Sequence, residues 1–405
     1  MRIEKTVSFM AAALAFMFLA VFVGIFRLMG MNFFATGILS GLYGLHSVIM
    51  VFGFLAIIVM TERISGVQLI PEAQKLKAPA LMVPSVAFGV VAETLGYASQ
   101  ILILKFLGAA LLVGGCLAFI VTLRFLRRSS EAKLSFDFMT LSVVSLLLAA
   151  IISAFTLPVD DMGFIMLLLV FPVLFILGER IELTRIVLSP KSYAKFKCVL
   201  VIAAASITLF AVGSIGGFGE MANLTFLMGS LLLLVVFVSV LIVEGQSLRL
   251  LLKSPRPLQH YVSRHVRIAY GWALIGMVMA AGYAVSGFEL DLYDPFIHSL
   301  TLGFIGTMML AHGPVILPGV LNRKFNEQKL TMLPLAVLTL SVVLRSGGDL
   351  IMLVSYSAVV RWIVGLSGWL VLGAALLFLS SIVRGISKPA IEVKNSLLAH
   401  SVSSN

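Results

Sequence analysis

The chain is a succession of apolar runs, each long enough to cross a lipid bilayer. A transmembrane helix needs about 20 consecutive, mostly apolar residues. Such runs occur at 8–29, 37–60, 79–98, 100–123, 138–157, 162–178, 198–217, 222–243, 268–287, 295–320, 331–356 and 360–383. With 60 % hydrophobic residues, 12 % charged residues and a mean hydropathy of +1.11, the chain is not a soluble globule. We therefore predict an all-α polytopic protein with twelve transmembrane helices in a lipid bilayer.

The distribution of Lys and Arg predicts how the chain is oriented. All but four of the 29 Lys and Arg residues fall in the N-terminus, the even-numbered loops and the C-terminal tail; the four on the other side are Arg27, Lys105, Arg345 and Arg361. Cytoplasmic loops carry the excess of Lys and Arg. Both termini are therefore expected in the cytoplasm, with the chain in the cytoplasmic (inner) membrane. This orientation accounts for the net charge of +11 without a nucleic-acid partner.

The predicted organisation is one domain and a tail. Residues 1–385 are expected to form a single twelve-helix membrane domain, and residues 386–405 a polar, disordered cytoplasmic tail. The longest loop, about 244–267, is too short for an inserted domain. Cys116 and Cys198 form no Cys-x-x-Cys pair and are interpreted as packing residues.

Histidines inside the apolar runs are the candidate functional residues. His46, His298 and His312 all lie within expected spans. An ionisable side chain in hydrocarbon costs at least a few kcal/mol, so it normally faces the protein interior and often belongs to a functional site. The alternative for His46 is a core histidine bonded to a neighbouring hydroxyl or carbonyl. His260 and His265 lie in a basic loop without a Cys or acid to complete a metal site, and are interpreted as solvated surface.

Two of these histidines suit the axial positions of a haem. Six-coordinate haem iron needs one neutral imidazole on each side. His46 lies roughly 20 Å from the inner end of its span. His298 matches that depth if its helix breaks at Gly313, and lies about 12 Å higher if the helix runs on to Leu321. We predict His46 and His298 as ligands of haem b, with His312 as a second ligand or an inner-side polar group.

Two arginines on the less basic side extend this prediction. The planar fork of Arg suits carboxylates, so Arg345 and Arg361 are expected to hold the haem propionates. Arg345 and Asp349 are also four residues apart on one helix face, which is equally consistent with a structural ion pair. The same buried pair suits a different class of protein, a secondary transporter of an anion or weak acid with helices interrupted by Gly and Pro.

The histidine-bearing spans carry a family resemblance. The second span resembles the second helix of the NnrS family through His46-x-x-x-Met50 followed by Phe52-Gly53-Phe54. The tenth span resembles the His- and Gly-bearing tenth helix of that family through Ile297-His298-Ser-Leu-Thr-Leu-Gly303-Phe-Ile-Gly306. Leu344-Arg345 and a Trp in the twelfth span also fit.

The resemblance implies a haem protein, with copper as a further cofactor. It also implies a link to nitric oxide through redox chemistry, resistance or electron transfer, with a redox partner. Val48 and Ile49 stand where the family's His-x-His-Glu-Met pattern has a second His and a Glu.

The second span is more distantly similar to the haem-ligand helix of haem–copper oxidases. Their copper site uses three histidines on spans 6 and 7, where this chain has none. If the protein is an enzyme, an oxidoreductase-like activity fits and proton-pumping oxygen reduction does not.

Overall fold

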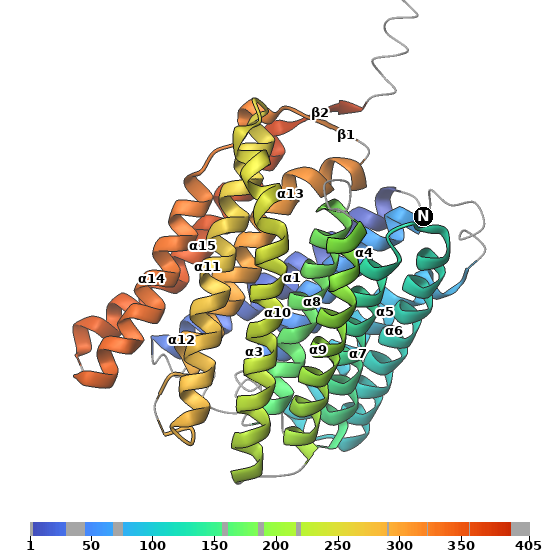
Figure 1. Ribbon diagram of the computed structural model, residues 1–405. Helices are drawn as coiled ribbons and strands as arrows, with labels where there is room; N and C mark the ends of the chain where they lie inside the picture. Colours follow the sequence, from blue (N-terminus) through green and yellow to red (C-terminus); the bar gives the residue numbers. More distant parts are fainter. Residues whose placement is uncertain are drawn as a thin grey trace, which may run out of the picture.

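Helices make up nearly all of the protein in the computed structural model shown in Figure 1. It describes residues 3–29, 45–67, 76–155, 161–184, 190–215, 220–289, 291–321, 323–355 and 357–389. Within these residues, 12 helical segments are long and apolar enough to cross a membrane. The all-α polytopic fold and the predicted number of spans are thus confirmed for the described chain.

Ten spans are single helices. They are α1 (Ile3–Leu28), α5 (Ala78–Ser99), α6 (Leu102–Ser129), α7 (Lys133–Phe155), α8 (Met162–Thr184), α9 (Pro190–Ile215), α10 (Glu220–Lys253), α11 (Pro257–Val285), α14 (Leu333–Val354) and α15 (Ala358–Gly385).

The two histidine-bearing spans are composite. Span 2 consists of α3 (His46–Val48), the π-helix η3 (Ile49–Ala56) and α4 (Ile57–Val67). Span 10 consists of α12 (Tyr293–His298), the π-helix η5 (Ser299–Gly306) and α13 (Thr307–Val320). In the described chain a short 3-10 turn, η6 (Glu327–Lys329), and the antiparallel strands β1 (Arg323–Phe325) and β2 (Ile386–Pro389) complete the elements.

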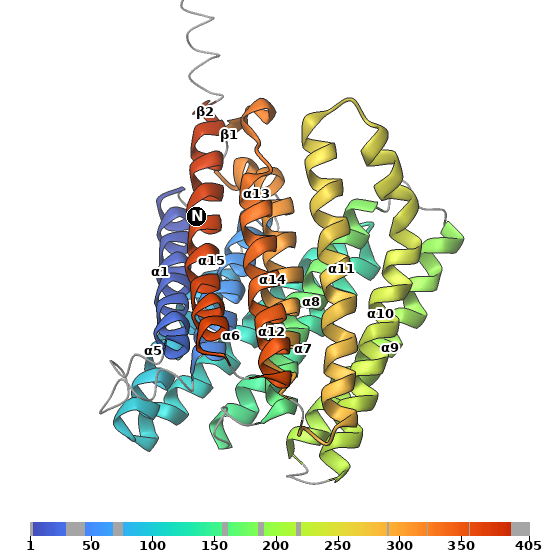
Figure 2. The ribbon, with the colours of Figure 1, turned by 90° about the vertical axis from the view of Figure 1, so that its left-hand side faces the viewer.

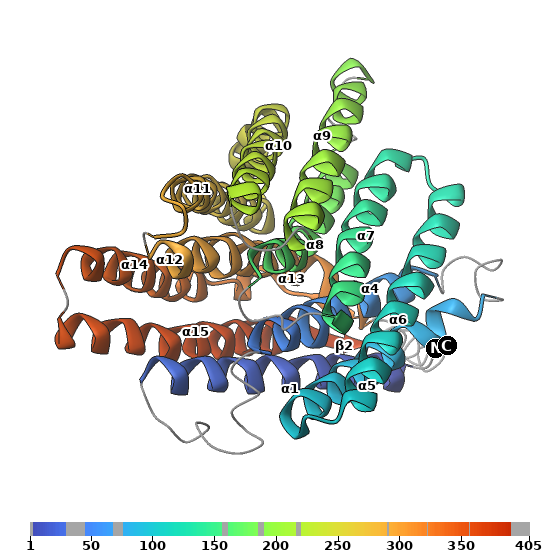
Figure 3. The same ribbon diagram turned by 90° about the horizontal axis from the view of Figure 1, so that it is seen from below.

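Span 2, α8 and span 10 lie in the middle of the bundle. Seen along the helices, the other spans surround them (Figure 3). The sixth span, α8, is the most enclosed, with 94 % of its apolar window buried. It contacts both π-helices, η3 and η5. The helices that carry the candidate ligands are therefore interior helices, as the cost of a polar side chain facing lipid requires.

The last two helices contribute no buried residue to the main core cluster of the described chain. That cluster includes buried residues from α1 through α13, whereas Leu338 of α14 and Ala374 of α15 form a separate small cluster with Leu310 of α13. Helix α15 lies beside α1 (Figure 2), where the rings of Phe22 and Trp369 meet edge to face at 6.3 Å. The α14–α15 hairpin thus covers one side of span 10 and α1.

Of the two alternatives for span 10, the unbroken helix is the one observed, because α13 continues past Gly313 to Val320. Two other helix ends differ from the sequence predictions. Span 2 continues to Val67, beyond the predicted residue 60. Residues 386–389, assigned to the tail, form β2 against β1, and the remainder of the tail lies outside the described residues.

The interpretation of His260 and His265 as loop residues is wrong. Both belong to α11, and His265 is fully buried. Its ring packs against that of Tyr261, with centroids 3.9 Å apart and the planes tilted by 36°. The basic residues around them lie on the exposed face of α11, in the part before the predicted span. Because of these residues, the segment has the composition of a loop.

The close pair α5–α6 provides a test of the packing. A Cβ at Gly108 would collide with the backbone of Glu93, whereas nothing lies within 4 Å of a Cβ at Gly114 on the same helix. We expect Gly108→Val to lower the free energy of unfolding by about 1–3 kcal/mol, the usual cost of overpacking. Unfolding of the detergent-solubilised protein by SDS titration measures this. Gly114→Val is the matched control, and equal losses in both variants would contradict the packing.

Candidate functional site

The two composite spans are built on the same plan. In each, a His-Ser pair lies close to the start of a π-helical segment of 8 residues: His46 lies three residues before η3 begins, and His298 lies directly before η5, whose first residue is Ser299. A buried Phe follows each His six residues later, at Phe52 and, in the other span, at the equivalent position of η5. π-Helical segments are rare and occur frequently at functional sites. The paired π-helices therefore mark the two histidines as counterparts.

A glycine in each π-helix receives an aromatic ring from the preceding helix. A Cβ at Gly53 would meet Phe16 of α1 at 2.8 Å, and a Cβ at Gly303 would meet Trp272 of α11 at 2.6 Å. Neither position tolerates a side chain without displacing that ring. The neighbouring helix can therefore approach the wide π-helical turn closely, which holds the segment and its histidine in place.

The two histidines lie at similar distances from the ends of their spans. His46 stands 21 residues before the end of α4 at Val67, and His298 stands 22 residues before the end of α13 at Val320. Each span ends with a π-helical part of 8 residues followed by an α-helical part. The similar spacing arises because span 2 is longer than predicted, and it does not require a break at Gly313.

All three intramembrane histidines use Nδ1 to bond a main-chain carbonyl. The acceptors are the carbonyl oxygens of Ala20 for His46 (2.9 Å), Asp294 for His298 (2.9 Å) and Met308 for His312 (2.8 Å). A carbonyl only accepts, so Nδ1 carries the proton, and in the neutral ring Nε2 carries the lone pair. This is the arrangement by which proteins orient a metal-ligating histidine.

A close approach of α1 accommodates His46. A Cβ at Gly24 would lie 3.3 Å from Cε1 of the ring, so this helix position leaves room for the imidazole. The alternative prediction, a histidine bonded to a neighbouring carbonyl, agrees with the bond to Ala20, but that bond is also what a ligand histidine requires.

The five predicted site residues line one cavity of about 1190 Å³. His46, His298, His312, Arg345 and Arg361 all contribute to its wall. The cavity lies among α1, span 2, α8, span 10 and the α14–α15 hairpin. Protein interiors leave few voids larger than a water molecule, and ligand sites are usually apolar cavities of this order with a few polar groups. We infer that the cavity serves a ligand.

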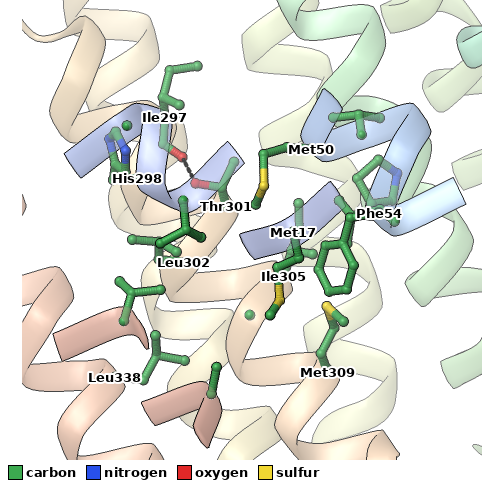
Figure 4. Close-up of a pocket in the computed structure, with 18 of the residues that line it drawn as sticks. Met17, Met50, Phe54, Ile297, His298, Thr301, Leu302, Ile305, Met309 and Leu338 are labelled. Carbon is green, nitrogen blue, oxygen red and sulfur yellow. Dashed lines mark hydrogen bonds between the residues drawn. The ribbon is translucent and has the colours of Figure 1, made fainter. Parts of the chain in front are cut away.

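The middle of the cavity is apolar and rich in sulfur. Figure 4 shows Met17, Met50 and Met309 pointing into the same part of it as Phe54, with His298 on the other side. The hydroxyl of Thr301 is satisfied within its own helix by the carbonyl of Ile297, at 2.8 Å. The wall between the polar ends therefore presents thioether and hydrocarbon surface.

An ion pair that the sequence did not predict fixes His298. Arg345 donates two hydrogen bonds to the carboxylate of Asp294, from Nε at 2.5 Å and from Nη2 at 2.8 Å. The same carboxylate lies 3.3 Å from Nδ1 of His298. Asp349, the predicted partner of Arg345, lies farther away at 3.5 Å. The fork of Arg345 is thus engaged by Asp294, which also positions the histidine.

Further buried polar groups occupy the other end of the cavity. The His312 ring is 5 % exposed, and its Nε2 has no hydrogen-bond partner among the described residues. Glu62 of α4 and Glu179 of α8 line the same end. Sequence reasoning missed both acids because carboxylates near a helix end are ordinary at a membrane surface.

The other three cations of the less basic side differ from Arg345 in what the structure describes of them. Arg361 lines the cavity and is itself exposed at the start of α15. The side chain of Arg27 lies outside the part of the chain that the structure describes. Lys105 does not belong to the cavity; its ammonium lies 4.8 Å from the ring of Tyr97.

The pairing of Arg345 predicts a stability effect. Replacing Asp294 by Ala leaves a guanidinium, 7 % exposed, beside Asp349 alone. Breaking a buried pair costs about 3–5 kcal/mol; because Asp294 is about a third exposed, we expect about 2 kcal/mol. Unfolding by SDS titration measures this, with the exposed Asp291→Ala as control. A loss below 0.5 kcal/mol, typical of surface substitutions, would show that the pair does not hold α12 to α14.

Comparisons with known proteins define the family without naming an activity. No curated protein matches the chain. A family model described as a domain of unknown function matches residues 6–383, which include every span and all the site residues above. The resemblance to NnrS proteins therefore stays a prediction. The chain belongs to the family of that domain of unknown function, DUF8744.

Proposed function

We propose that the protein is a membrane haem b protein of NnrS type. His46 and His298 are the axial ligands, one from each composite span. The role is nitric oxide-related redox chemistry, nitric oxide resistance or electron transfer. Bound haem supplies one-electron chemistry and, where an axial position opens, a site for nitric oxide.

The observation that carries this proposal is the pairing of the two spans around one cavity. His46 and His298 each lie within three residues of the start of a π-helix, at similar distances from the ends of their spans, with Nδ1 bonded to a carbonyl in each. Both line the same cavity. Two imidazoles on two helices, each with Nε2 as the coordinating nitrogen, are the donor set of a six-coordinate haem. Because a haem needs only two protein ligands, no larger metal-binding cluster is required.

The shape and chemistry of the cavity fit a flat, largely apolar group. Its middle is lined by Met, Phe, Ile and Leu side chains, and its polar groups gather at the two ends. A macrocycle would fill the space between the main core and the α14–α15 hairpin. Gly306 lies in the wall, and the nearest atoms to a Cβ there are 3.5 Å away, so this position leaves space beside the helix. Gly368 instead allows Ile25 of α1 to approach α15.

The two arginines predicted to bind the haem propionates differ in their contacts. Arg345 is neutralised by Asp294, so its fork is no longer available without breaking that pair. Arg361 also lines the cavity on the less basic side. We therefore propose Arg361 as a propionate contact, because it lines the cavity, and Arg345 as the residue that holds Asp294 and through it His298.

Copper has less support than haem. Among the described residues, no group of three or more His, Cys, Asp or Glu side chains gathers as a metal site. Thioethers do favour Cu(I), and Met17, Met50 and Met309 line the cavity. Copper is retained as a proposal of the family resemblance, and His312 as a buried polar group at the inner end.

The transporter alternative is the weaker proposal. An anion would need free positive charge, but Arg345 is paired with Asp294. Six carboxylates and two guanidiniums line the cavity, namely Glu62, Glu179, Glu289, Asp291, Asp294, Asp349, Arg345 and Arg361. This acidic balance disfavours an anionic substrate.

The proposal includes the location of the protein in the cytoplasmic (inner) membrane, with both termini in the cytoplasm. It rests on the distribution of Lys and Arg among the loops.

Loss of either ligand histidine should remove the haem. We expect His46→Ala and His298→Ala each to lower the haem content of the purified protein by roughly tenfold or more. Visible spectra of the oxidised and dithionite-reduced protein measure this. His265→Ala is a matched control, because that histidine makes the same Nδ1 bond to a carbonyl but lies outside the cavity. A wild-type protein that stays colourless after haem is supplied would refute the proposal.

The two arginines should separate in their effects. Arg361→Leu should lower the haem midpoint potential, because removal of a positive charge near the iron disfavours the reduced state. Arg345→Leu should instead lower haem affinity by about tenfold through loss of His298 positioning. Spectroelectrochemical titration and haem-binding curves distinguish the two outcomes. Full haem affinity in Arg345→Leu would contradict the positioning role.

A further inference from the structure

A second, smaller cavity lies against the main one at the end that carries the basic loops. Its volume is about 310 Å³, and it is lined by Ser129 and Ser130 at the end of α6 and by Glu182 near the end of α8. Glu62 lines both this cavity and the main cavity. The wall between the two spaces is therefore a single layer of charged side chains.

Arg63 closes that wall through contacts with three carboxylates. Its Nη2 lies 2.7 Å from Glu179 and 3.8 Å from Glu62, and its Nη1 lies 3.4 Å from Glu182. The guanidinium also lies over the ring of Phe175, 5.4 Å from its centroid. These groups come from α4 and α8, so the ion pairs join two interior spans across the boundary between the cavities.

Buried polarity on the main-cavity side implies water there. The Nε2 atom of His312 is buried and has no protein partner among the described residues, yet the ring lines the main cavity. Buried polar atoms in native proteins are almost always satisfied by protein or by ordered water. A polar end of this volume can hold such water. The charged layer at Arg63 thus separates two spaces that both suit water.

The charged groups that line the two cavities determine which ions they favour. The main cavity has six carboxylates and two guanidiniums in its wall, although the whole chain carries a net charge of +11. The small cavity adds Glu182 and the three-carboxylate surroundings of Arg63. A cleft lined by one sign of charge concentrates the opposite ion. Small cations, hydronium among them, are favoured over anions along the entire path.

We propose that the Glu62–Arg63–Glu179–Glu182 cluster is a gated, cation-selective inlet from the basic face into the main cavity. Arg63 is the latch: its ion pairs keep the layer closed, and its displacement connects the two cavities. Glu62 is the carboxylate that a cation meets on both sides. The nearby Arg180 does not compete for these acids, because its fork is held by Glu244. The inlet goes beyond haem binding and does not depend on it.

Cysteine accessibility tests the route without any cofactor. In a Cys198→Ser background, which removes the exposed thiol while Cys116 stays buried, one reporter is placed on each side of the layer. Ser129→Cys lies in the small cavity, and Val59→Cys lies in the main cavity one helical turn from Arg63. Membrane vesicles of both orientations are treated with a cationic or an anionic methanethiosulfonate reagent of similar size. The vesicles in which Ser129→Cys reacts expose the basic face.

The labelling rate of Val59→Cys should depend on the face from which the reagent is added, on Arg63 and on the charge of the reagent. When the cationic reagent is added from the basic face, Val59→Cys should react at least about tenfold faster in the Arg63→Gln variant than with Arg63 in place. In that variant the anionic reagent should react more slowly than the cationic reagent by a similar factor. Labelling of Ser129→Cys should change little. Reaction of Val59→Cys from the opposite face only, equal rates for both reagents, or no effect of Arg63→Gln would each overturn the proposal.

A milder variant guards against misfolding. Glu182 is the most exposed partner of Arg63, with 34 % of its side chain accessible. Glu182→Gln removes one latch contact without leaving a buried charge unpaired, and should speed labelling of Val59→Cys by about threefold, since one exposed ion pair contributes under 1 kcal/mol. Asp291→Cys, exposed on the opposite face, reports a folded protein when its own labelling rate is unchanged.

Discussion

A charge inside a membrane must find its counter-charge within the protein, and this constraint organises the bundle. Lipid offers no solvation, so an unpaired guanidinium in a span is too costly to persist. Three interior arginines each bond a carboxylate from a different span, in the pairs Arg345–Asp294, Arg180–Glu244 and Arg63–Glu179. Each pair therefore joins two helices at a defined height. The Arg345–Asp294 pair matters most for the site, because the same carboxylate contacts Nδ1 of His298. The helix that carries a proposed ligand and the helix that closes the cavity are held together by one interaction.

The spans could be predicted because length and apolarity are properties of single helices. Each run of about 20 apolar residues corresponds to a helix long enough to cross the membrane. The π-helices could not be predicted in this way. Their segments, Ile49–Ala56 and Ser299–Gly306, are apolar on all sides, so no periodicity distinguishes a wide turn from an α-helical one. The signal was present in another form, as a repeated His-Ser with a Phe six residues after the His. A comparison of the two halves of the chain aligns span 2 with span 8. It therefore does not align the two copies, which lie in spans 2 and 10.

Sequence reasoning found the site residues that are unusual by themselves in an apolar span. It did not find the contacts between residues of different helices. His46, His298 and His312 attract notice because imidazoles are unusual in hydrocarbon, and all three line the cavity. Arg345 was also singled out, but its partner was assigned by helix spacing to Asp349. The closer partner is Asp294 on another span, and spacing along one helix carries no information about contacts between helices. Glu62 and Glu179 were passed over for the same reason. Only the folded arrangement, in which Arg63 of α4 pairs with Glu179 of α8, shows that the two acids line a cavity.

The cavity and the outside of the protein carry opposite charge, and the two have different causes. The Lys and Arg residues behind the net charge of +11 lie mainly in the loops of one face, and they are the basis of the proposed orientation in the membrane. The cavity wall is acidic, so the field inside is set by local carboxylates and not by the sign of the whole molecule. An acidic, largely apolar cavity stabilises a cationic centre such as ligated iron and disfavours anions. Buried acids line the cavity together with thioether and hydrocarbon surface. The proposed haem would use His46 and His298 alone as ligands, so Glu62 and Glu179 would remain for the proposed passage of cations.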